Sequence, residues 1–263
     1  IYYTKSGSGK PLLLVHDLDS ASCGYEWNLL INSLKEHYTV YTIDLLGCGR
    51  SEKTHFTYRN YVYVQLICDF IKSEIGKKSN VIVSGESVSF VSMACSSSPD
   101  LFDKLMFINP KSLTDFCRVP GKHGKMYKFI LDLPLVGTML YNIASSKMSL
   151  RQMFCTKYFY NPHRIRSVYI NKFYEAAHLG ECPKAVFSSL KCNYTKCNIV
   201  NALKNINNSI YIVAGSGQDD VPALIEEYRA YNPAIEYSVI ANTRQLPHME
   251  NPAKVLEYIY IFM

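Results

Sequence analysis

The chain has 263 residues, of which 48% are hydrophobic and 19% are charged, and its formal net charge is +6. This length fits one domain, or one domain with an inserted subdomain, built around a substantial core. Lys and Arg are scattered, whereas a nucleic-acid groove needs a clustered basic stripe, so no nucleic-acid partner is expected. No run of about 18 apolar residues could span a membrane. We expect a globular monomer or homodimer.

The nine cysteines form an odd set without a CxxC pair, and several, such as Cys68 and Cys95, lie inside apolar runs. This pattern favours reduced, buried thiols and a cytoplasmic location over a disulfide framework. Cys192 and Cys197 have no matching second pair, so we expect no metal and no cofactor. The chain starts at Ile1 without a methionine, which is also compatible with a trimmed N-terminus and a removed signal or anchor.

Strands and helices alternate in the first part of the chain. Apolar and β-branched runs predict strands at residues 1–5, 11–15, 39–43, 80–83 and 105–108. Helical spacing predicts helices at residues 25–35 and 58–75, the second ending at Gly76, and Gly7-Ser8-Gly9 indicates a hairpin turn. This rhythm is typical of an α/β fold with a doubly wound, mostly parallel sheet, which binds ligands beyond the carboxyl ends of its strands.

Residues 111–200 break this rhythm and indicate an inserted helical cap. Helices are expected at residues 124–131, 137–145, 149–155 and 163–177. The segment is rich in Tyr and Phe, and for any single ring we favour packing within the cap over contact with a substrate. A strand at 209–214, a helix at 222–231, a strand at 234–240 and a C-terminal helix follow. The predicted core is therefore 1–110 with 201–263, and the predicted cap is 111–200.

The segment NVIVSGESVSF, residues 80–90, has the layout of a nucleophile elbow. In an elbow of the pattern G-x-S-x-G, a sharp turn between a strand and a helix lifts a serine hydroxyl above the end of the sheet. Here Ser87 is the candidate serine, and Ser89 replaces the last glycine. The alternative is an ordinary strand-turn-helix junction, because Gly and Ser are common at such places.

Four segments in the right order then resemble motifs of the α/β-hydrolase superfamily, in its cap-bearing serine hydrolase and esterase form. They are PLLLVHD, YTIDLLGCGRSEK, SGESVS and NTRQLPHMENP. The resemblance implies that Ser87 is the nucleophile and that the N–H groups of Val88 and Leu18 (or Asp17) form the oxyanion hole. Asp17 stands where the family usually has a glycine, and Glu86 is a residue type that the family uses beside the serine.

The expected catalytic base is missing, because Gln245 stands at the position of the family's histidine. Either His248 serves as a displaced base, or another histidine such as His16 does, or the triad is broken. A glutamine there can only hydrogen-bond.

The resemblance places the acid three residues after the glycine that ends a strand, in the pattern G-x-x-D. Counting from Gly215 reaches Gln218, counting from Gly217 reaches Asp220, and Asp219 lies between them. We take Ser87, Asp219 and His248 as the candidate catalytic residues. The expected lining residues of the site are Gln245, His16, Asp17, Glu86 and Asp220.

Two functions remain open. The first is hydrolysis of a small hydrophobic ester, thioester, amide or lactone through Ser87, with an impaired triad. The second is a catalytically silent pseudo-hydrolase that binds a small apolar ligand or a partner. Non-hydrolytic chemistry on the same scaffold ranks last, since it also usually needs the missing histidine.

Overall fold

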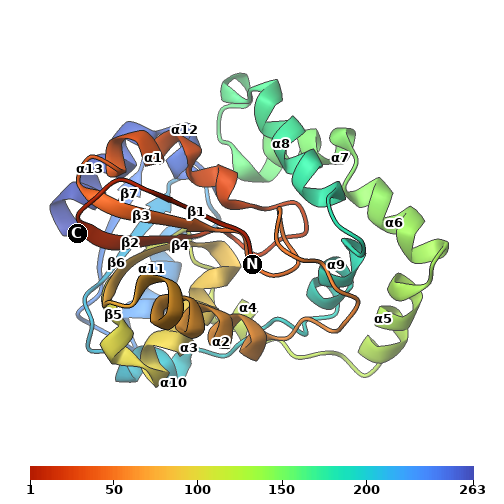
Figure 1. Ribbon diagram of the computed structural model, residues 1–263, viewed down its shortest axis with the longest axis horizontal. Coiled ribbons are helices and arrows are strands. Elements are labelled where there is room, and N and C mark those ends of the chain that lie inside the picture. The colour runs from red at the N-terminus through yellow and green to blue at the C-terminus, as the bar shows by residue number, and fades with distance from the viewer.

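The computed structural model describes all 263 residues and contains a seven-stranded sheet flanked by helices (Figure 1). The strand order is β1-β3-β2-β4-β5-β6-β7, and every neighbouring pair except β1–β3 is parallel. The predicted doubly wound, mostly parallel sheet is therefore confirmed. The strands are β1 (Tyr3–Ser6), β2 (Lys10–Val15), β3 (Tyr38–Ile43), β4 (Ser79–Ser84), β5 (Phe102–Ile108), β6 (Ile210–Gly215) and β7 (Glu236–Ile240).

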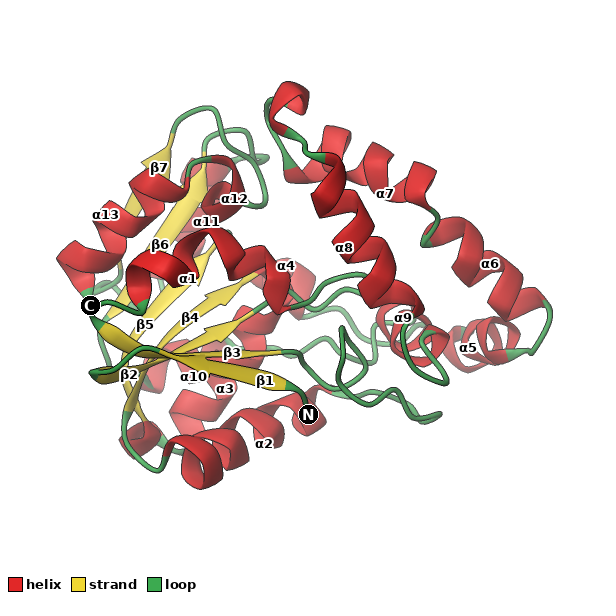
Figure 2. Cartoon of the chain, turned by 45° about the horizontal axis from the view of Figure 1, so that its top comes forward, coloured by secondary structure: helices red, strands yellow, loops and turns green.

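Alternate residues of the central strands supply two separate hydrophobic layers, as the two-residue period of a strand requires. In β2, Leu13 and Val15 pack into the larger layer, whereas Leu12 and Leu14 pack into the smaller one. The larger layer is covered by α2 (Asn60–Phe70), α3 (Val88–Ser97), α10 (Val200–Asn205) and α11 (Val221–Arg229). The smaller layer is covered by α1 (Asn28–Leu34) and α13 (Pro252–Phe262) (Figure 2).

The predicted hairpin at Gly7-Ser8-Gly9 is wrong, because β1 pairs antiparallel with β3 and not with β2. Both edges of β2 are already occupied, by β3 and by β4. Gly7 and Gly9 have positive φ, and they reverse the chain so that β1 can cross to the outer side of β3.

The long helix predicted at 58–75 is also more complex than the pattern indicated. The α-helix α2 ends at Phe70, and a π-helical turn continues from Ile71 to Ile75. Gly76 ends the element as predicted: it adopts the left-handed conformation, and its N–H donates to the carbonyl of Ile71 at 2.8 Å.

Between β5 and β6 the chain forms helices and no strand. Before α10, the α-helices are α4 (Leu113–Phe116), α5 (Gly124–Asp132), α6 (Val136–Ala144), α7 (Lys147–Met153), α8 (Ser167–His178) and α9 (Lys184–Lys191). Residues 111–200 are called the helical insertion below, and Figure 1 shows α5 to α9 beside the sheet, on the side away from the C-terminus. The division into a core domain and a cap domain stays a prediction.

Aromatic residues of the helical insertion form a third hydrophobic cluster. It contains Phe154, Tyr158, Phe159, Tyr169 and Phe173, together with Met249 of α12 (Pro247–Glu250) and Leu246, which directly precedes that helix. The insertion is therefore packed against the last loops of the sheet. All nine cysteines are free, and six of them are buried. None of the helices has the length and apolar character needed to span a bilayer.

The carboxylate of Glu250 ties the helical insertion to the loop after β7. It accepts the N–H groups of Tyr160 at 2.9 Å, Asn161 at 3.2 Å and Arg244 at 2.8 Å. Charge-assisted hydrogen bonds of this kind are about twice as strong as neutral ones. Glu250 is buried, so its removal would leave backbone donors of two separate segments unpaired.

We expect Glu250→Ala to lower the free energy of unfolding by about 2–4 kcal/mol, since several backbone N–H groups lose a charged acceptor. The matched control is Glu257→Ala, which removes only an exposed ion pair with Lys254 and should cost less than about 1 kcal/mol. Urea denaturation of the two variants measures the difference. Equal costs would contradict the role of Glu250 as a tie between the segments.

Candidate functional site

The sharpest backbone turn after β4 lies at Gly85. Ser84 is still extended, Gly85 has φ of +57°, and a single 3-10 turn over Gly85–Ser87 leads directly into α3. Ser87 itself has φ of −66° and ψ of −15°, which is ordinary right-handed helical geometry. The predicted strand-turn-helix junction is present. Its residue with positive φ is Gly85, two positions before Ser87.

The hydroxyl predicted to attack a substrate, and one of the N–H groups predicted to bind an oxyanion, already form hydrogen bonds within the chain. The hydroxyl of Ser87 donates to the carbonyl of His16 at 2.7 Å, and the side chain is fully buried. The N–H of Val88 is directed to the carbonyl of Glu86. The N–H of Leu18 makes no hydrogen bond, although Leu18 is buried in the core. The catalytic role of Ser87 stays a prediction, and this geometry does not favour it.

The carboxylate of Asp17 fills the space directly above Gly85. Its Oδ1 accepts the N–H of Glu86 at 2.6 Å. A Cβ atom placed on Gly85 would lie 2.2–2.4 Å from three carboxyl atoms of Asp17, closer than any real contact. Only a glycine therefore fits at position 85 while Asp17 holds this conformation. The sequence shows that Asp17 is unusual at this position, but it does not indicate the contact with Gly85.

His16 is held by two hydrogen bonds that leave no ring nitrogen free. Nε2 accepts the N–H of Leu45 at 2.9 Å, and Nδ1 lies 2.7 Å from the carbonyl of Asp17. A backbone N–H can only donate and a carbonyl can only accept, so these partners place the ring proton on Nδ1. To act as a base toward Ser87, His16 would have to break the bond to Leu45.

His248 is fully buried and lines no cleft. Its ring stacks on Trp27 with a centroid distance of 4.3 Å, and its Nε2 lies 3.5 Å from Oε1 of Glu26. The same Glu26 oxygen accepts the hydroxyl of Ser84 at 2.5 Å. His248 therefore packs among residues of the smaller hydrophobic layer, which does not favour its predicted role as a displaced base.

The two positions that the motifs assign to the acid and the base are joined by a hydrogen bond. Nε2 of Gln218 donates to Oε1 of Gln245 at 2.9 Å, and Gln245 is buried. Asn109 connects the same loops, because its amide bonds the carbonyl of Gln245 and the N–H of Gly215. An acid and a histidine would be related in this way in a working triad. Here both groups are amides.

The two aspartates proposed as the acid lie outside this arrangement. Asp220 has φ of +46° and caps α11, where its side chain accepts the N–H of Ala223 at 3.3 Å. Asp219 is exposed and its side chain forms no hydrogen bond or ion pair. Neither aspartate is brought to Gln245, so the observed positions favour a structural role for Asp220 and solvent exposure for Asp219.

Charged residues that the sequence did not indicate gather around Glu86. Nζ of Lys196 lies 2.8 Å from Oε2 of Glu86 and also contacts Asp115. Burial raises the pKa of Glu86, and the charge of Lys196 opposes that shift. Burial lowers the pKa of Lys111, and the nearby Asp17 opposes it. Lys196 is far from Glu86 in the chain, so no local pattern could have indicated this pair.

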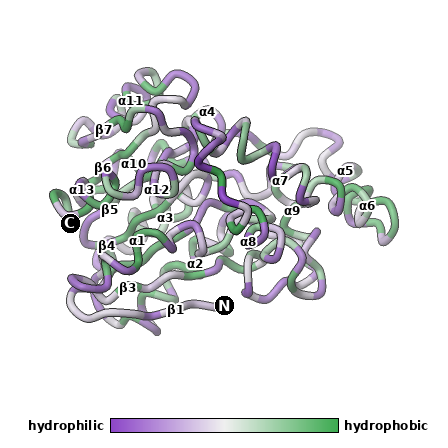
Figure 3. Tube along the Cα trace, turned by 90° about the horizontal axis from the view of Figure 1, so that it is seen from above, coloured by the Kyte–Doolittle hydropathy of each residue, from purple (hydrophilic) through white to green (hydrophobic).

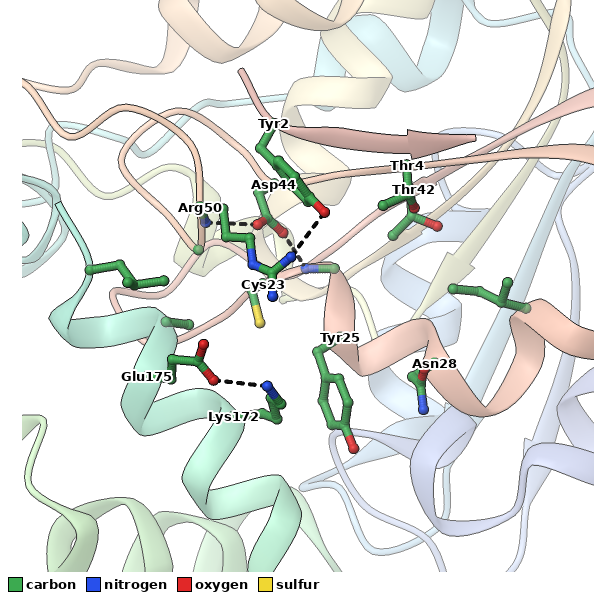
Figure 4. A pocket seen from close by; sticks show the side chains of 15 residues that line it. Tyr2, Thr4, Cys23, Tyr25, Asn28, Thr42, Asp44, Arg50, Lys172 and Glu175 are labelled. Atoms are coloured by element: carbon green, nitrogen blue, oxygen red, sulfur yellow. Dashed lines mark hydrogen bonds and ion pairs between the residues drawn. The ribbon is translucent and has the colours of Figure 1, made fainter. Parts of the chain in front are cut away.

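A cavity of about 340 Å³ lies between the core and α8, on the β1 side of the sheet (Figure 4). Its apolar lining includes Cys23, Tyr25, Ile31, Ala176 and Leu179. Two cationic side chains also line it: Arg50, which donates to the hydroxyl of Tyr2 at 3.0 Å, and Lys172, which pairs with Glu175 at 2.9 Å. The carboxylates of Asp44 and Glu175 belong to the same lining. No residue of the elbow, and neither Gln218 nor Gln245, lines this cavity.

A family model described as Alpha/beta hydrolase family matches residues 12–258 of the chain. A soluble epoxide hydrolase from Corynebacterium sp. (strain C12) is 43% identical over 53 residues, which are 20% of this chain and 18% of that protein. A 2-hydroxy-6-oxo-6-(2'-aminophenyl)hexa-2,4-dienoic acid hydrolase from Metapseudomonas resinovorans is 32% identical over 72 residues, 27% of this chain and 25% of that protein. These matches span about a quarter or less of either relative.

Solved structures of the same fold cover the whole chain. A meta-cleavage product hydrolase from Pseudomonas fluorescens IP01 has a TM-score of 0.80 and 15% identity, covering 99% of this chain and 92% of that one. The structure titled "Epoxide hydrolase CorEH without ligand" has a TM-score of 0.77 and 21% identity, covering 99% and 93%. At these identities the similarity extends to the fold alone.

The contact between Asp17 and Gly85 can be tested by stability. Gly85→Ala should lower the free energy of unfolding by about 2–5 kcal/mol, since it adds left-handed strain to a steric clash. Gly76→Ala is the matched control, because Gly76 has φ of +64° and nothing within 4 Å of an added Cβ; it should cost about 1–2 kcal/mol.

In an Asp17→Gly background the cost of Gly85→Ala should fall to that of Gly76→Ala. Chemical denaturation of the four variants and the wild type completes this comparison. A cost of Gly85→Ala that does not depend on residue 17 would mean that the carboxylate does not occupy the space above Gly85.

Proposed function

The chain belongs to the alpha/beta hydrolase family, and we propose that it is a catalytically silent member that binds a small, largely apolar ligand. The observation that carries this proposal is the carboxylate of Asp17, which lies above Gly85 and accepts the N–H of Glu86 at 2.6 Å. Family membership makes hydrolysis the competing function. The geometry of the elbow favours binding without hydrolysis.

On this proposal Gly85, and not Ser87, occupies the nucleophile position. In a nucleophile elbow the strained residue between strand and helix bears the nucleophile, and the next N–H is an oxyanion donor. Gly85 is the residue with positive φ after β4, and Glu86 is the next residue. The N–H that would stabilise a developing oxyanion is then already occupied by a carboxylate, which also repels negative charge.

The paired glutamines support the same conclusion at the other end of the site. Gln245 replaces the base and Gln218 replaces the acid, and the two amides bond each other at 2.9 Å. An amide takes up no proton near neutral pH, so neither side chain can activate a hydroxyl. The pair preserves the connection between the loops after β6 and β7 without the chemistry.

The cavity beside α8 is the proposed ligand site. Its volume of about 340 Å³ is within the range of small-molecule pockets, and its lining combines apolar side chains with two cations, Arg50 and Lys172, and two carboxylates, Asp44 and Glu175. Lys172 is paired with Glu175, whereas the Arg50 side chain forms no ion pair within the chain, so a small apolar molecule with a carboxylate group fits this lining. The apolar part would contact Tyr25 and Ile31, and the carboxylate would lie near Arg50.

Hydrolysis through Ser87 requires two changes from the observed arrangement. The hydroxyl would have to leave the carbonyl of His16, and His248 would have to leave Trp27 or be replaced by another base. Such an enzyme would act on a small ester, thioester, amide or lactone.

A fluorophosphonate probe separates these functions, because it labels only an activated serine. We expect no labelling of the wild type and turnover of p-nitrophenyl acetate equal to that of buffer. Ser87→Ala should leave both readings unchanged and should lower stability by about 1 kcal/mol, through loss of the hydrogen bond to His16. Labelling that disappears in Ser87→Ala would establish Ser87 as a nucleophile and overturn the proposal.

A combined variant tests whether residue 85 or residue 87 occupies the nucleophile position. The combined variant Asp17→Gly, Gly85→Ser, Gln218→Asp and Gln245→His should become labelled at residue 85 and should hydrolyse p-nitrophenyl acetate. Gln245→His alone should gain nothing, because Asp17 still covers the elbow. Circular dichroism of each variant controls for loss of fold. A folded quadruple variant that is labelled at Ser87 would contradict the assignment of Gly85.

Ligand binding can be measured as a shift in melting temperature. Among apolar carboxylates, such as medium-chain fatty acids and aromatic acids, we expect some to raise Tm by about 5–10 °C at about 100 times Kd. Ala176→Phe should remove the shift by filling the cavity, whereas Ala144→Phe, on the exposed side of α6, should retain it. A shift that persists in Ala176→Phe would place the ligand elsewhere.

A further inference from the structure

The apolar face of α6 is turned away from the rest of the protein. Its large non-aromatic hydrophobic residues recur at the three- and four-residue spacing that normally faces a core, and all of them are exposed. They are Val136, Met139, Leu140 and Ile143. The buried residues of this helix, Gly137 and Tyr141, lie on its other side. The helix therefore packs by its less apolar face and presents its hydrophobic stripe to the outside.

Neighbouring segments extend this stripe. Phe129 on α5 is 67% exposed, Leu135 between α5 and α6 is 86% exposed, and Met148 at the start of α7 is 83% exposed. The apolar ridge is defined as Phe129, Leu135, Val136, Met139, Ile143 and Met148. Figure 1 places α5 and α6 at the end of the molecule farthest from the C-terminus, and Figure 3 shows hydrophobic stretches along both helices. Exposed apolar surface of this extent marks an interaction site.

The charge around the apolar ridge is predominantly positive. Residues 118–151 contain six basic side chains and a single acidic one, Asp132, which pairs with Lys128 at 2.6 Å. The basic residues are Arg118, Lys122, Lys125, Lys128, Lys147 and Arg151. Lys122, Lys125 and Lys147 are exposed and form no ion pair with the protein. The surface thus combines apolar side chains with unpaired positive charge.

We propose that the apolar ridge is a membrane-docking surface that inserts into the headgroup boundary of a bilayer containing anionic lipids. An amphipathic helix with hydrophobic and basic residues binds such a surface while lying in its plane. Each lysine near an anionic leaflet adds electrostatic attraction. A second copy of the chain fits less well, because a symmetric contact would bring the two basic sets together.

Sedimentation with lipid vesicles tests the proposal on the whole chain. The protein should bind vesicles of phosphatidylcholine mixed with phosphatidylserine, bind pure phosphatidylcholine more weakly, and be released as salt is raised. Leu135→Glu combined with Met148→Glu should reduce binding by about tenfold or more, because two apolar side chains leave the bilayer and two charges replace them.

Two further variants test the contribution of the lysine charges and the specificity of the apolar substitutions. Lys122→Gln combined with Lys125→Gln should remove most of the preference for phosphatidylserine. Ile261→Glu is the matched control: Ile261 is 72% exposed on α13, at the opposite end of the molecule, so binding should not change. Absence of vesicle binding would overturn the proposal, as would equal effects of Ile261→Glu and Leu135→Glu/Met148→Glu. Self-association that the double variant abolishes, without vesicle binding, would identify a second copy as the occupant and also overturn it.

Discussion

The hydrogen bond between the Asp17 carboxylate and the Glu86 N–H connects the end of β2 to the turn that leads into α3. A carboxylate at the start of a helix is stabilised by the free N–H groups and by the helix dipole. The contact also has a steric consequence, since the carboxyl atoms leave no room for a side chain on Gly85. One interaction thus orders the elbow and excludes a side chain from its sharpest residue.

The surrounding hydrogen bonds depend on the same arrangement. His16 is fixed between Asp17 and Leu45, and its own carbonyl accepts the hydroxyl of Ser87. These bonds join the loop after β2, the loop after β3 and the elbow into one buried network. In an enzyme of this fold, the corresponding donors and acceptors must remain available to substrate. Here all of them except the N–H of Leu18 are satisfied within the chain, so the network contributes to stability.

The sequence predicted the fold well because its signals are local. Runs such as Leu12 to Val15 must form buried strands, and their order with the intervening helices specifies a parallel sheet. The hairpin at Gly7 failed because the pairing partner of β1 is distant in the chain.

Motif spacing led to Gln245 directly and to Gln218 by only one of two counts, whereas the acid was assigned to Asp219 and the sharp turn at Gly85 was not predicted. The pattern G-x-S-x-G fits only with Ser87 at its centre, and it is the backbone angle at Gly85 and the conformation of Asp17 that place the sharp turn two residues earlier.

The amide of Gln245 is only partly paired within the chain. Its Nε2 is buried and has no hydrogen-bond partner within the chain. Such a donor costs about 1–3 kcal/mol, and replacing Gln245 by an apolar residue would remove that cost. The hydrogen bond from Gln218 offsets part of that cost and joins the loops after β6 and β7, so Gln245 acts as a structural link that lies apart from the cavity beside α8.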